Sequence, residues 1–297
     1  MVVKFKDVEY FQQLAKLKSY TKTAAFFQVK QPTITYAIKR LEEEVQTELL
    51  VRNQSHAQIQ LTPAGKILAK HAQNILKELA LAKLEINHLQ EVQVRLGLPP
   101  IIGNFYFPKV SKALAAQQLL AKLEISNSGS QELYQALLKG QLDLAIVGMM
   151  NPLYDDQIEI LPIAQKQFKI VVGRHHPLAK QKSVAFIELV EEKFVVLNEQ
   201  YIHPKAMQKL AKQAGFTPKV IYQNSDLNIL KGMIKEGVGI GFLVEIAVDE
   251  QKDELVCLEI ADKNQPSFHI SLLSRKNQPA SVSQQVVQQI LEENLLS

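Results

Sequence analysis

A long segment without helix-breaking residues is the feature that most constrains the fold of this chain. After Pro63 and Gly65, the sequence contains neither proline nor glycine until beyond residue 91. Thr62 is a suitable helix cap, and Pro63 stands at the first helical position, where its missing N–H costs nothing. We therefore predict one long helix over residues 62–91.

The apolar residues of this segment follow a period of 3.5 residues, with successive spacings of 4, 3, 4, 3, 4 and 3. A helix packed only against its own domain would drift to a 3.6-residue period and carry a wider apolar stripe. A sustained 3.5-residue period is instead typical of a helix that lies against a partner helix. We predict dimerisation through this stripe, whose members are Leu68, Ala72, Ile75, Leu79, Ala82, Ile86 and Leu89.

Charge divides the chain into two unequal parts. Residues 1–90 contain 13 basic and 8 acidic side chains, whereas residues 91–297 contain 21 basic and 22 acidic ones. The first 40 residues alone hold 8 basic and 2 acidic side chains. A small basic module followed by a larger neutral body suits a polyanion such as DNA, although a solvated charged face is the alternative.

Composition excludes several classes of protein. A chain of 297 residues with 46% apolar and 22% charged residues is typical of a globular protein of about two domains. The single cysteine, Cys257, excludes an intrachain disulfide. The N-terminus is charged, and no apolar run reaches the ~18 residues that span a bilayer. We expect a cytoplasmic protein with no membrane partner.

Three short helical patterns occupy the first 45 residues. The first is predicted over Phe5–Leu17, the second after Thr21 as a cap, and the third from Gln31 and Pro32. The third helix has one apolar stripe, and its opposite face is polar. The stripe consists of Ile34, Ile38, Leu41 and Val45.

The polar face of the third helix suits a DNA major groove. Short hydroxyl and amide side chains near its start match base edges, and the cations that follow match phosphates. A short hairpin predicted over residues 49–62, with its tip at residues 53–57, would be the wing of a winged helix-turn-helix. An ordinary three-helix cap with a polar surface is the alternative. The residues expected to contact DNA are Lys22, Gln31, Pro32, Thr33, Thr35, Tyr36, Lys39, Arg40 and Arg52.

Several motifs together resemble the LysR-type transcriptional regulators. They include Ser19–Ala25, Lys30–Thr35 and Leu61–Gly65, with looser matches at Leu138–Ile146 and Glu236–Gly241. Lys30 departs from the family pattern, which often has serine there, and Tyr36 stands where arginine is frequent. The resemblance implies a winged helix-turn-helix at 1–61, a linker helix at 62–91 and a two-lobed α/β effector-binding domain, similar to periplasmic binding proteins, at 92–297. Its lobes would be 92–161 with 268–297, and 162–267.

The body itself alternates strand and helix patterns. Strands are predicted at 92–98, 142–147, 169–173 and 194–197, and helices at 108–121, 131–139, 204–214 and 227–236. This alternation indicates an α/β fold with mainly parallel sheets. Such sheets bind ligands beyond the carboxyl ends of their strands.

The resemblance places the effector cleft at loops that precede helices, whose N-termini bind carboxylates well. Ser130 and Ser225 have the simpler alternative of capping those helices. The string from Leu98 to Gly103 resembles regulators of organic-acid metabolism, so we expect a small organic acid. The residues expected to bind it are Pro100, Ile101, Ile102, Asn104, Ser128, Gly129, Tyr201, His203, Asn224 and Ser225.

Other chemistries find little support in the sequence. The run Gly237–Gly241 lacks the spacing of a dinucleotide loop, and His175 and His176 stand without a ligand cluster. We expect no catalytic residues, no metal and no cofactor. The predicted function is a sequence-specific DNA-binding regulator controlled by a small molecule. The resemblance implies that the protein binds an imperfect inverted repeat in DNA and assembles as a dimer or a dimer of dimers. The alternative is an enzyme or solute-storage protein with an appended helix-turn-helix.

Overall fold

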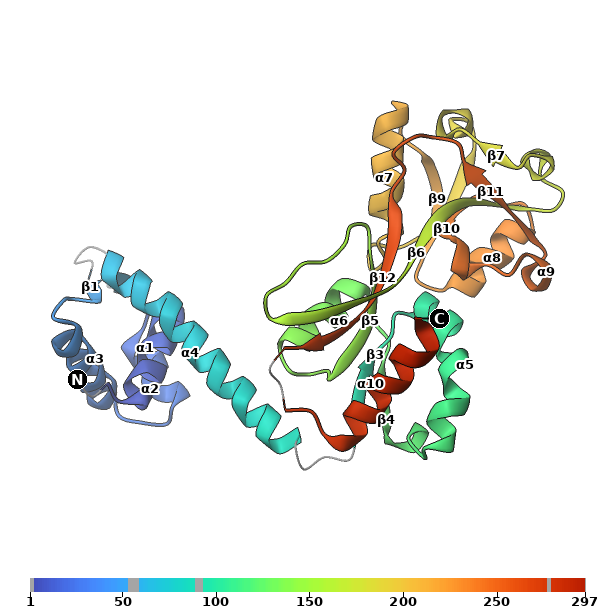
Figure 1. Ribbon diagram of the computed structural model, residues 1–297. Helices are drawn as coiled ribbons and strands as arrows, with labels where there is room; N and C mark the ends of the chain where they lie inside the picture. Colours follow the sequence, from blue (N-terminus) through green and yellow to red (C-terminus); the bar gives the residue numbers. More distant parts are fainter. Residues whose placement is uncertain (1–2, 53–58, 89–92, 277–278, 297) are drawn as a thin grey trace. The chain divides into compact units, whose positions relative to one another are not determined.

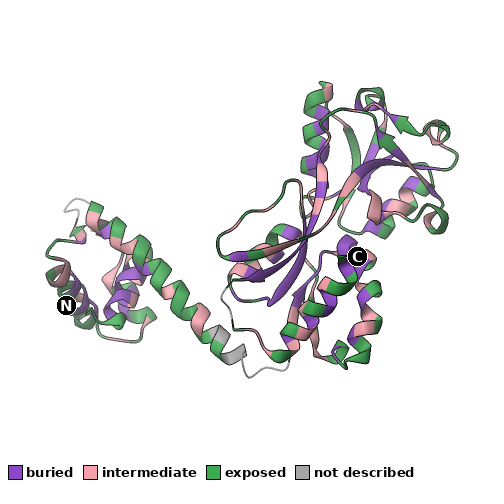
Figure 2. Cartoon of the chain, viewed as in Figure 1, coloured by how far each residue is buried: buried purple, intermediate pink, exposed green. Residues whose placement is uncertain are grey.

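The chain forms two compact units, Met1–Ile86 and Asn87–Ser297 (Figure 1). The computed structural model describes residues 3–52, 59–88, 93–276 and 279–296. Buried side chains gather inside each unit (Figure 2), so each unit has a hydrophobic core of its own.

The first unit is built from helices and one small hairpin. Phe5–Leu17 lies where the apolar pattern predicted it, and the third helix starts at Gln31, as the proline at position 32 predicted. The second helix begins one residue after Ser19. Ser19, and not Thr21, caps it: the Ser19 side chain accepts a hydrogen bond from the Lys22 N–H. The elements are α1 (Phe5–Leu17), α2 (Tyr20–Phe26), α3 (Gln31–Val45), β1 (Leu50–Arg52), β2 (Ile59–Leu61) and α4 (Pro63–His88).

The start of α4 is tied to the hairpin. The Thr62 hydroxyl accepts a hydrogen bond from the Gly65 N–H at 2.9 Å, which confirms Thr62 as the cap. The Thr62 N–H donates to the carbonyl of Leu49 at 3.0 Å. A Cβ added to Gly65 would lie 2.1 Å from the carbonyl oxygen of Leu49. Glycine at position 65 therefore allows α4 to approach the backbone that leads into β1.

The second unit combines strands and helices in two lobes. In Figure 1, α5 and α10 lie side by side next to β3, while α7 and α8 belong to the other lobe. Its helices are α5 (Pro100–Ala116), α6 (Ser130–Leu138), α7 (His203–Ala214), α8 (Leu227–Lys235), α9 (Glu250–Asp253) and α10 (Val282–Leu295). Its strands are β3 (Val94–Gly97), β4 (Leu123–Ser126), β5 (Leu144–Met149), β6 (Ile158–Gly173), β7 (Ser183–Val184), β8 (Lys193–Leu197), β9 (Lys219–Asn224), β10 (Gly241–Val244), β11 (Leu255–Ile260) and β12 (Ser267–Arg275).

One strand runs through both lobes. β6 is 16 residues long and pairs with β12 over residues 158–167, then with β10 and β11 over residues 168–173. All these pairings, and that of β12 with β5, are antiparallel. The expectation of mainly parallel sheets was therefore wrong, because the strands that join the lobes run against their neighbours. The strand order is β4-β3-β5-β12-β6-β11-β7, with β10 on β6 and with β8 and β9 as a separate parallel pair.

Helix α5 begins earlier than the sequence indicated. Proline at 108 was expected to mark its start, but α5 begins at Pro100 and Pro108 lies inside it. Ile101, Ile102 and Tyr106 face the core, so the first turns of α5 are held by apolar packing. The helix start consequently falls directly after the loop that follows β3.

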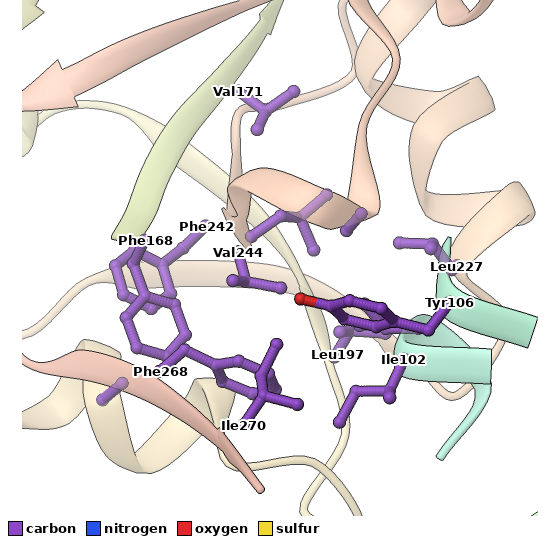
Figure 3. Close-up of a cluster of buried hydrophobic side chains, with 14 of the residues drawn as sticks. Ile102, Tyr106, Phe168, Val171, Leu197, Leu227, Phe242, Val244, Phe268 and Ile270 are labelled. Atoms are coloured by element: carbon purple, nitrogen blue, oxygen red, sulfur yellow. The ribbon is translucent and has the colours of Figure 1, made fainter. Parts of the chain in front are cut away.

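Aromatic side chains fill the region where the lobes meet. The rings of Phe168 on β6 and Phe242 on β10 are stacked at 4.9 Å, and Phe268 on β12 meets Phe168 edge-on at 5.9 Å. Figure 3 shows this group together with Ile102 and Tyr106 from α5. The long strands are thus fixed to both lobes by one continuous core.

Substitution of Gly65 by alanine tests the close approach of α4. The added Cβ must push against the Leu49 carbonyl, and overpacking of this kind costs about 1–3 kcal/mol. We expect Gly65→Ala to lower the urea midpoint of the full chain. Gly232→Ala, in α8, is the control, since nothing lies within 4 Å of its added Cβ. Equal midpoints for the two variants would contradict this account.

Candidate functional site

Helix α3 presents the polar face that the sequence predicted. Ile34, Ala37, Ile38 and Leu41 are buried, which turns the other side of the helix to solvent. Tyr36 is 63% exposed, and Lys22 on α2 is also exposed. The remaining predicted DNA contacts that lie exposed on α3 are Gln31, Pro32, Thr33 and Lys39.

Two of the predicted DNA-contact residues have partners within the unit. The half-buried Thr35 donates its hydroxyl to the carbonyl of Gln31 at 3.3 Å. Arg40 forms two hydrogen bonds with the buried carboxylate of Asp7, from Nε at 2.8 Å and from Nη2 at 2.6 Å. The hydrogen bond to Asp7 raises the pKa of the Arg40 guanidinium. Arg40 therefore ties α3 to α1. The sequence of residues 1–40 contains no pattern that predicts this ion pair between Arg40 and Asp7.

The predicted wing is only partly described. β1 and β2 pair antiparallel, with Leu50 opposite Leu61 and Arg52 opposite Ile59. The predicted tip at residues 53–57 and the side chain of Arg52 lie outside the described part of the chain.

The predicted dimerisation stripe divides into two parts. Leu68 and Ala72 pack against the core of the first unit. Further along α4, Ile75, Leu79 and Ile86 are 53%, 38% and 62% exposed, while Ala82 is half-buried. Leu89 lies outside the described residues. The part of the stripe beyond Ala72 therefore forms exposed apolar surface on α4.

In the second unit, a cavity of about 240 Å³ collects half of the predicted effector residues. Pro100, Ser128, Gly129, Tyr201 and Ser225 line it. Three further lining residues were not among those expected to bind the acid, namely Asn127, which lies in a loop expected to border the cleft, Glu132 and Gln200. Asn127 and Gln200 adjoin predicted residues in polar loops, whereas Glu132 looked like an ordinary acidic residue in the first turn of a helix.

Four helices begin around this cavity. Pro100 is the first residue of α5, and Gly129 is the N-cap of α6. Tyr201 and Ser225 lie two residues before α7 and α8 begin. The first turns of helices carry N–H groups without helical partners and the positive end of the helix dipole. At α8, the N–H groups of Asn228 and Ile229 already bond to the carboxylate of Asp226. Glu132 is the single charged residue among the eight that line the cavity.

The loops around the cavity touch closely. A Cβ on Gly129 would lie 2.3 Å from the carbonyl oxygen of Gln200, so glycine permits this contact between the α6 and α7 loops. The hydroxyl of Tyr201 donates to the carbonyl of Ser225 at 2.9 Å, and burial raises its pKa. These contacts bring the starts of α6, α7 and α8 together at one point.

The alternative in which the two serines cap the helices does not hold, since Gly129 and Asp226 are the N-caps. Ser130 lies inside α6, where its hydroxyl accepts from the Gly148 N–H at 2.9 Å. Asp226, not Ser225, caps α8, with its carboxylate accepting from Asn228 and Ile229. Ser225 is thereby left exposed at the cavity.

The other predicted effector residues lie elsewhere. Ile102 is fully buried in the core, and Ile101 and Asn104 line a separate groove of about 880 Å³ between α5 and α8. The Asn224 side chain accepts from the Asp226 N–H and donates to the Tyr222 hydroxyl. The cavity therefore brings together only the loop residues closest to the helix starts.

His203 is buried beside the aromatic group. Its Nε2 accepts a hydrogen bond from the Val244 N–H at 3.3 Å, and its ring meets Phe168 at 5.4 Å and Tyr201 at 6.0 Å. Among the described residues, none pairs with its buried Nδ1. Burial lowers the pKa of His203 to about 3, so its ring is neutral near pH 7.

Little else in the described residues resembles a reactive centre. Burial raises the pKa of the Cys257 thiol to about 12, so the thiol is protonated. No group of three or more His, Cys, Asp or Glu side chains in the described ranges could hold a metal ion. Within the same ranges, no helix has the length and apolarity needed to cross a membrane.

Comparison with known proteins relates both units to the same family. Residues 5–66 match "Bacterial regulatory helix-turn-helix protein, lysR family", and residues 88–295 match "LysR substrate binding domain". The malolactic fermentation system transcriptional activator of Lactococcus lactis is 32% identical over 98% of this chain and 99% of its own length. A hydrogen peroxide-inducible genes activator of Pectobacterium carotovorum is 26% identical over 92% of this chain and 91% of its own.

Solved structures share the fold. A full-length OxyR variant from Pseudomonas aeruginosa matches with a TM-score of 0.56 at 20% identity, covering 98% of this chain and 94% of its own. The effector-binding domain of QuiR in complex with shikimate gives a TM-score of 0.57 at 17% identity, covering 68% and 96%.

The burial of His203 predicts a pH dependence of stability. Its pKa is about 3 in the fold and 6.5 when unperturbed, so below pH 6.5 the unfolded chain binds a proton that the folded chain does not. Stability is therefore fully present above pH 6.5 and falls as the pH drops towards 3, by at most about 1.4 kcal/mol per pH unit.

Urea unfolding between pH 7.5 and 4.5 measures this slope. We expect His203→Gln to reduce the slope by about one proton. His71→Gln, at an exposed position on α4, should leave it unchanged. The same slope in the wild type and in His203→Gln would show that His203 protonates freely in the folded protein.

Proposed function

Because this chain belongs to the LysR family of transcriptional regulators, with a DNA-binding helix-turn-helix and an effector-binding domain, we propose that a small organic acid controls its contacts with DNA. The acid binds in the cavity at the starts of α5, α6, α7 and α8. The convergence of these four helix starts is the observation that carries the proposal, since helix N-termini bind carboxylates. The Lactococcus relative is named for malolactic fermentation, which supports an acid of the malate and lactate type.

The chemistry around the cavity is compatible with a carboxylate ligand. No lysine, arginine or histidine is among the eight lining residues, so backbone N–H groups and polar side chains would supply the hydrogen bonds. The neutral His203 nearby adds no positive charge. Recognition of the acid therefore rests on fixed dipoles rather than on an ion pair.

Peroxide sensing, which the name of the Pectobacterium relative would suggest, is less compatible with this chain. Its sequence has one cysteine, so it cannot form an intrachain disulfide. A thiolate is the reactive form of cysteine, and the raised pKa of Cys257 keeps the thiol protonated. This supports a bound ligand, rather than thiol oxidation, as the signal. We likewise infer a regulator rather than an enzyme or a storage protein, because relatives that cover 98% and 92% of this chain are named as activators.

We propose that Gln31, Thr33 and Tyr36 read base edges and that Lys22, Pro32, Lys39 and Arg52 lie against the DNA backbone. The hydrogen bonds of Arg40 to Asp7 give Arg40 the separate task of holding α3 against α1, whereas the Thr35 hydroxyl bonds within α3 to the carbonyl of Gln31. Base readout by hydroxyl, amide and aromatic groups would follow from the exposed face of α3.

Pairing of two copies completes the proposed DNA-binding form. Ile75, Leu79 and Ile86 on α4 would be covered by the same residues of a second chain. Two copies would present two α3 helices to an imperfect inverted repeat, as a dimer or a dimer of dimers. A protein that binds chromosomal DNA acts in the bacterial cytoplasm, and we place this chain there.

Footprinting on the DNA upstream of its own gene, with and without malate, tests the function. We expect protection of two half-sites related by a two-fold axis, and a changed pattern at millimolar malate. Protection that weakens steeply with salt is also expected, because phosphate contacts release counterions. An identical footprint with malate, succinate or no acid would contradict control by an organic acid. Absence of any protected two-fold site would contradict the DNA-binding part.

Two substitutions on α3 separate phosphate contact from base readout. Lys39→Ala should weaken binding to all DNA sequences and reduce the slope of log affinity against log salt by about 1. Tyr36→Ala should reduce the preference for operator over unrelated DNA while leaving that slope unchanged. Fluorescence anisotropy titrations at several salt concentrations measure both quantities. Equal losses on operator and unrelated DNA for Tyr36→Ala would remove it from base readout.

A further inference from the structure

We propose that Glu42 is a positioning residue for DNA recognition. Through the backbone of Leu49, it fixes helix α3, whose exposed face is proposed to contact DNA, to the start of α4, which carries the predicted dimerisation stripe. The inference rests on the proposed function, because it assumes that two copies pair along α4 and bind two half-sites. It goes further by naming the residue that sets how the two α3 helices are spaced and turned on the DNA.

The carboxylate of Glu42 accepts hydrogen bonds from the chain that follows α3. Glu42 lies in the last turn of α3, and its Oε1 accepts from the Leu49 N–H at 2.9 Å and from the Leu50 N–H at 3.4 Å. An acidic side chain near the C-terminus of a helix opposes the helix dipole, so this position by itself destabilises α3. The two N–H groups that lead into β1 give the carboxylate a role that offsets this cost.

Leu49 is bonded to the start of α4 as well. Its carbonyl accepts the Thr62 N–H at 3.0 Å, and Gly65 lies against the same carbonyl. The Thr62 hydroxyl donates to the carbonyl of Glu48 at 2.7 Å and accepts from the Gly65 N–H at 2.9 Å. The N–H of Leu49 is thus bonded to α3 and its carbonyl to the cap of α4, so one buried residue joins the two helices.

Apolar packing joins α4 to the same core as α3. Leu68 and Ala69 of α4 are half-buried against the core cluster that contains Ile34 and Ile38 of α3. Hydrophobic attraction is non-directional, whereas a hydrogen bond restricts both the distance and the angle between its partners. The hydrogen bonds at Leu49 therefore restrict the rotation of α3 relative to α4 more closely than the apolar contacts do.

The orientation of α3 relative to α4 decides which DNA sites a pair of chains fits. In a dimer joined along α4, the two α3 helices reach their half-sites at one separation and one rotation. One base pair inserted between the half-sites moves them about 3.4 Å apart and turns them by about 35° relative to each other. A firmly held α3 therefore makes binding depend steeply on the spacing, and a loosened α3 makes binding tolerate other spacings.

Operators with altered spacing test this inference. The full chain is titrated by fluorescence anisotropy against the site found by footprinting, and against the same site with one base pair inserted or removed between its half-sites. We expect the wild type to bind the altered sites about 10-fold or more weakly, because the DNA must be deformed to restore the fit. Glu42→Ala should bind them within about 3-fold of the original site, because α3 has lost its directional hydrogen bonds to Leu49 and Leu50.

Glu42→Gln and Glu43→Ala are the matched controls, because each removes one negative charge from α3, as Glu42→Ala does. The glutamine retains the Oε1 acceptor, and Glu43 is the exposed neighbour of Glu42. Both variants should keep the spacing dependence of the wild type. Glu42→Asp keeps the charge but is one carbon shorter, so it should lose the spacing dependence, and it decides the matter if circular dichroism shows that Glu42→Ala does not fold.

The outcomes separate this inference from the proposed function. The same spacing dependence in the wild type, Glu42→Ala and Glu42→Asp would overturn the inference and leave the proposed function in place, since apolar packing alone would then hold α3. If the wild type itself binds all spacings equally, the proposed pairing along α4 on two half-sites fails, and the inference fails with it.

Discussion

The antiparallel pairing of β6 with β12 is the interaction on which the effector-binding domain depends. β6 continues beyond this pairing to carry β10 and β11, so a single strand belongs to the sheets of both lobes. The rings of Phe168 on β6 and Phe268 on β12 pack edge-on and stabilise the position where these two strands pass between the lobes. Because the lobes share these strands, the loops before α5, α6, α7 and α8 meet at one small cavity.

The sequence predicted local structure well and long-range contacts poorly. The apolar period that marked Phe5–Leu17, and the cap and proline that marked the start of α4, depend on neighbours within one or two turns, so both could be read directly. The first ten residues of the joining strand β6 could not be recognised as a strand, because apolar and polar residues alternate only weakly there. Their partner strand β12 also lies about 100 residues away in the sequence. The start of α5 was misjudged because Pro100, and not Pro108, is its first residue, and Ile101 and Ile102 are buried in its first turn.

The same difference applies to the candidate sites. Polar loops before helices identified Pro100, Ser128, Gly129, Tyr201 and Ser225, because helix starts leave N–H groups that ligands can use. Glu132 was missed, since an acidic residue in a first turn usually serves only the helix dipole. The pairing of Arg40 with Asp7 joins two helices that are adjacent only in the fold. Charged side chains thus occur in two settings. Exposed cations such as Lys39 lie on the face proposed to contact DNA, and Glu132 is the one charged residue that lines the cavity.

Hydrogen exchange measured by mass spectrometry, with and without malate, tests the central claim that the acid binds at the helix starts. The account predicts slower exchange in three segments, residues 127–132, 199–204 and 224–228, and no change around Lys109 and Asp249 in the separate groove. Protection confined to that groove, or to residues 152–165 at the other hollow of this unit, would contradict it.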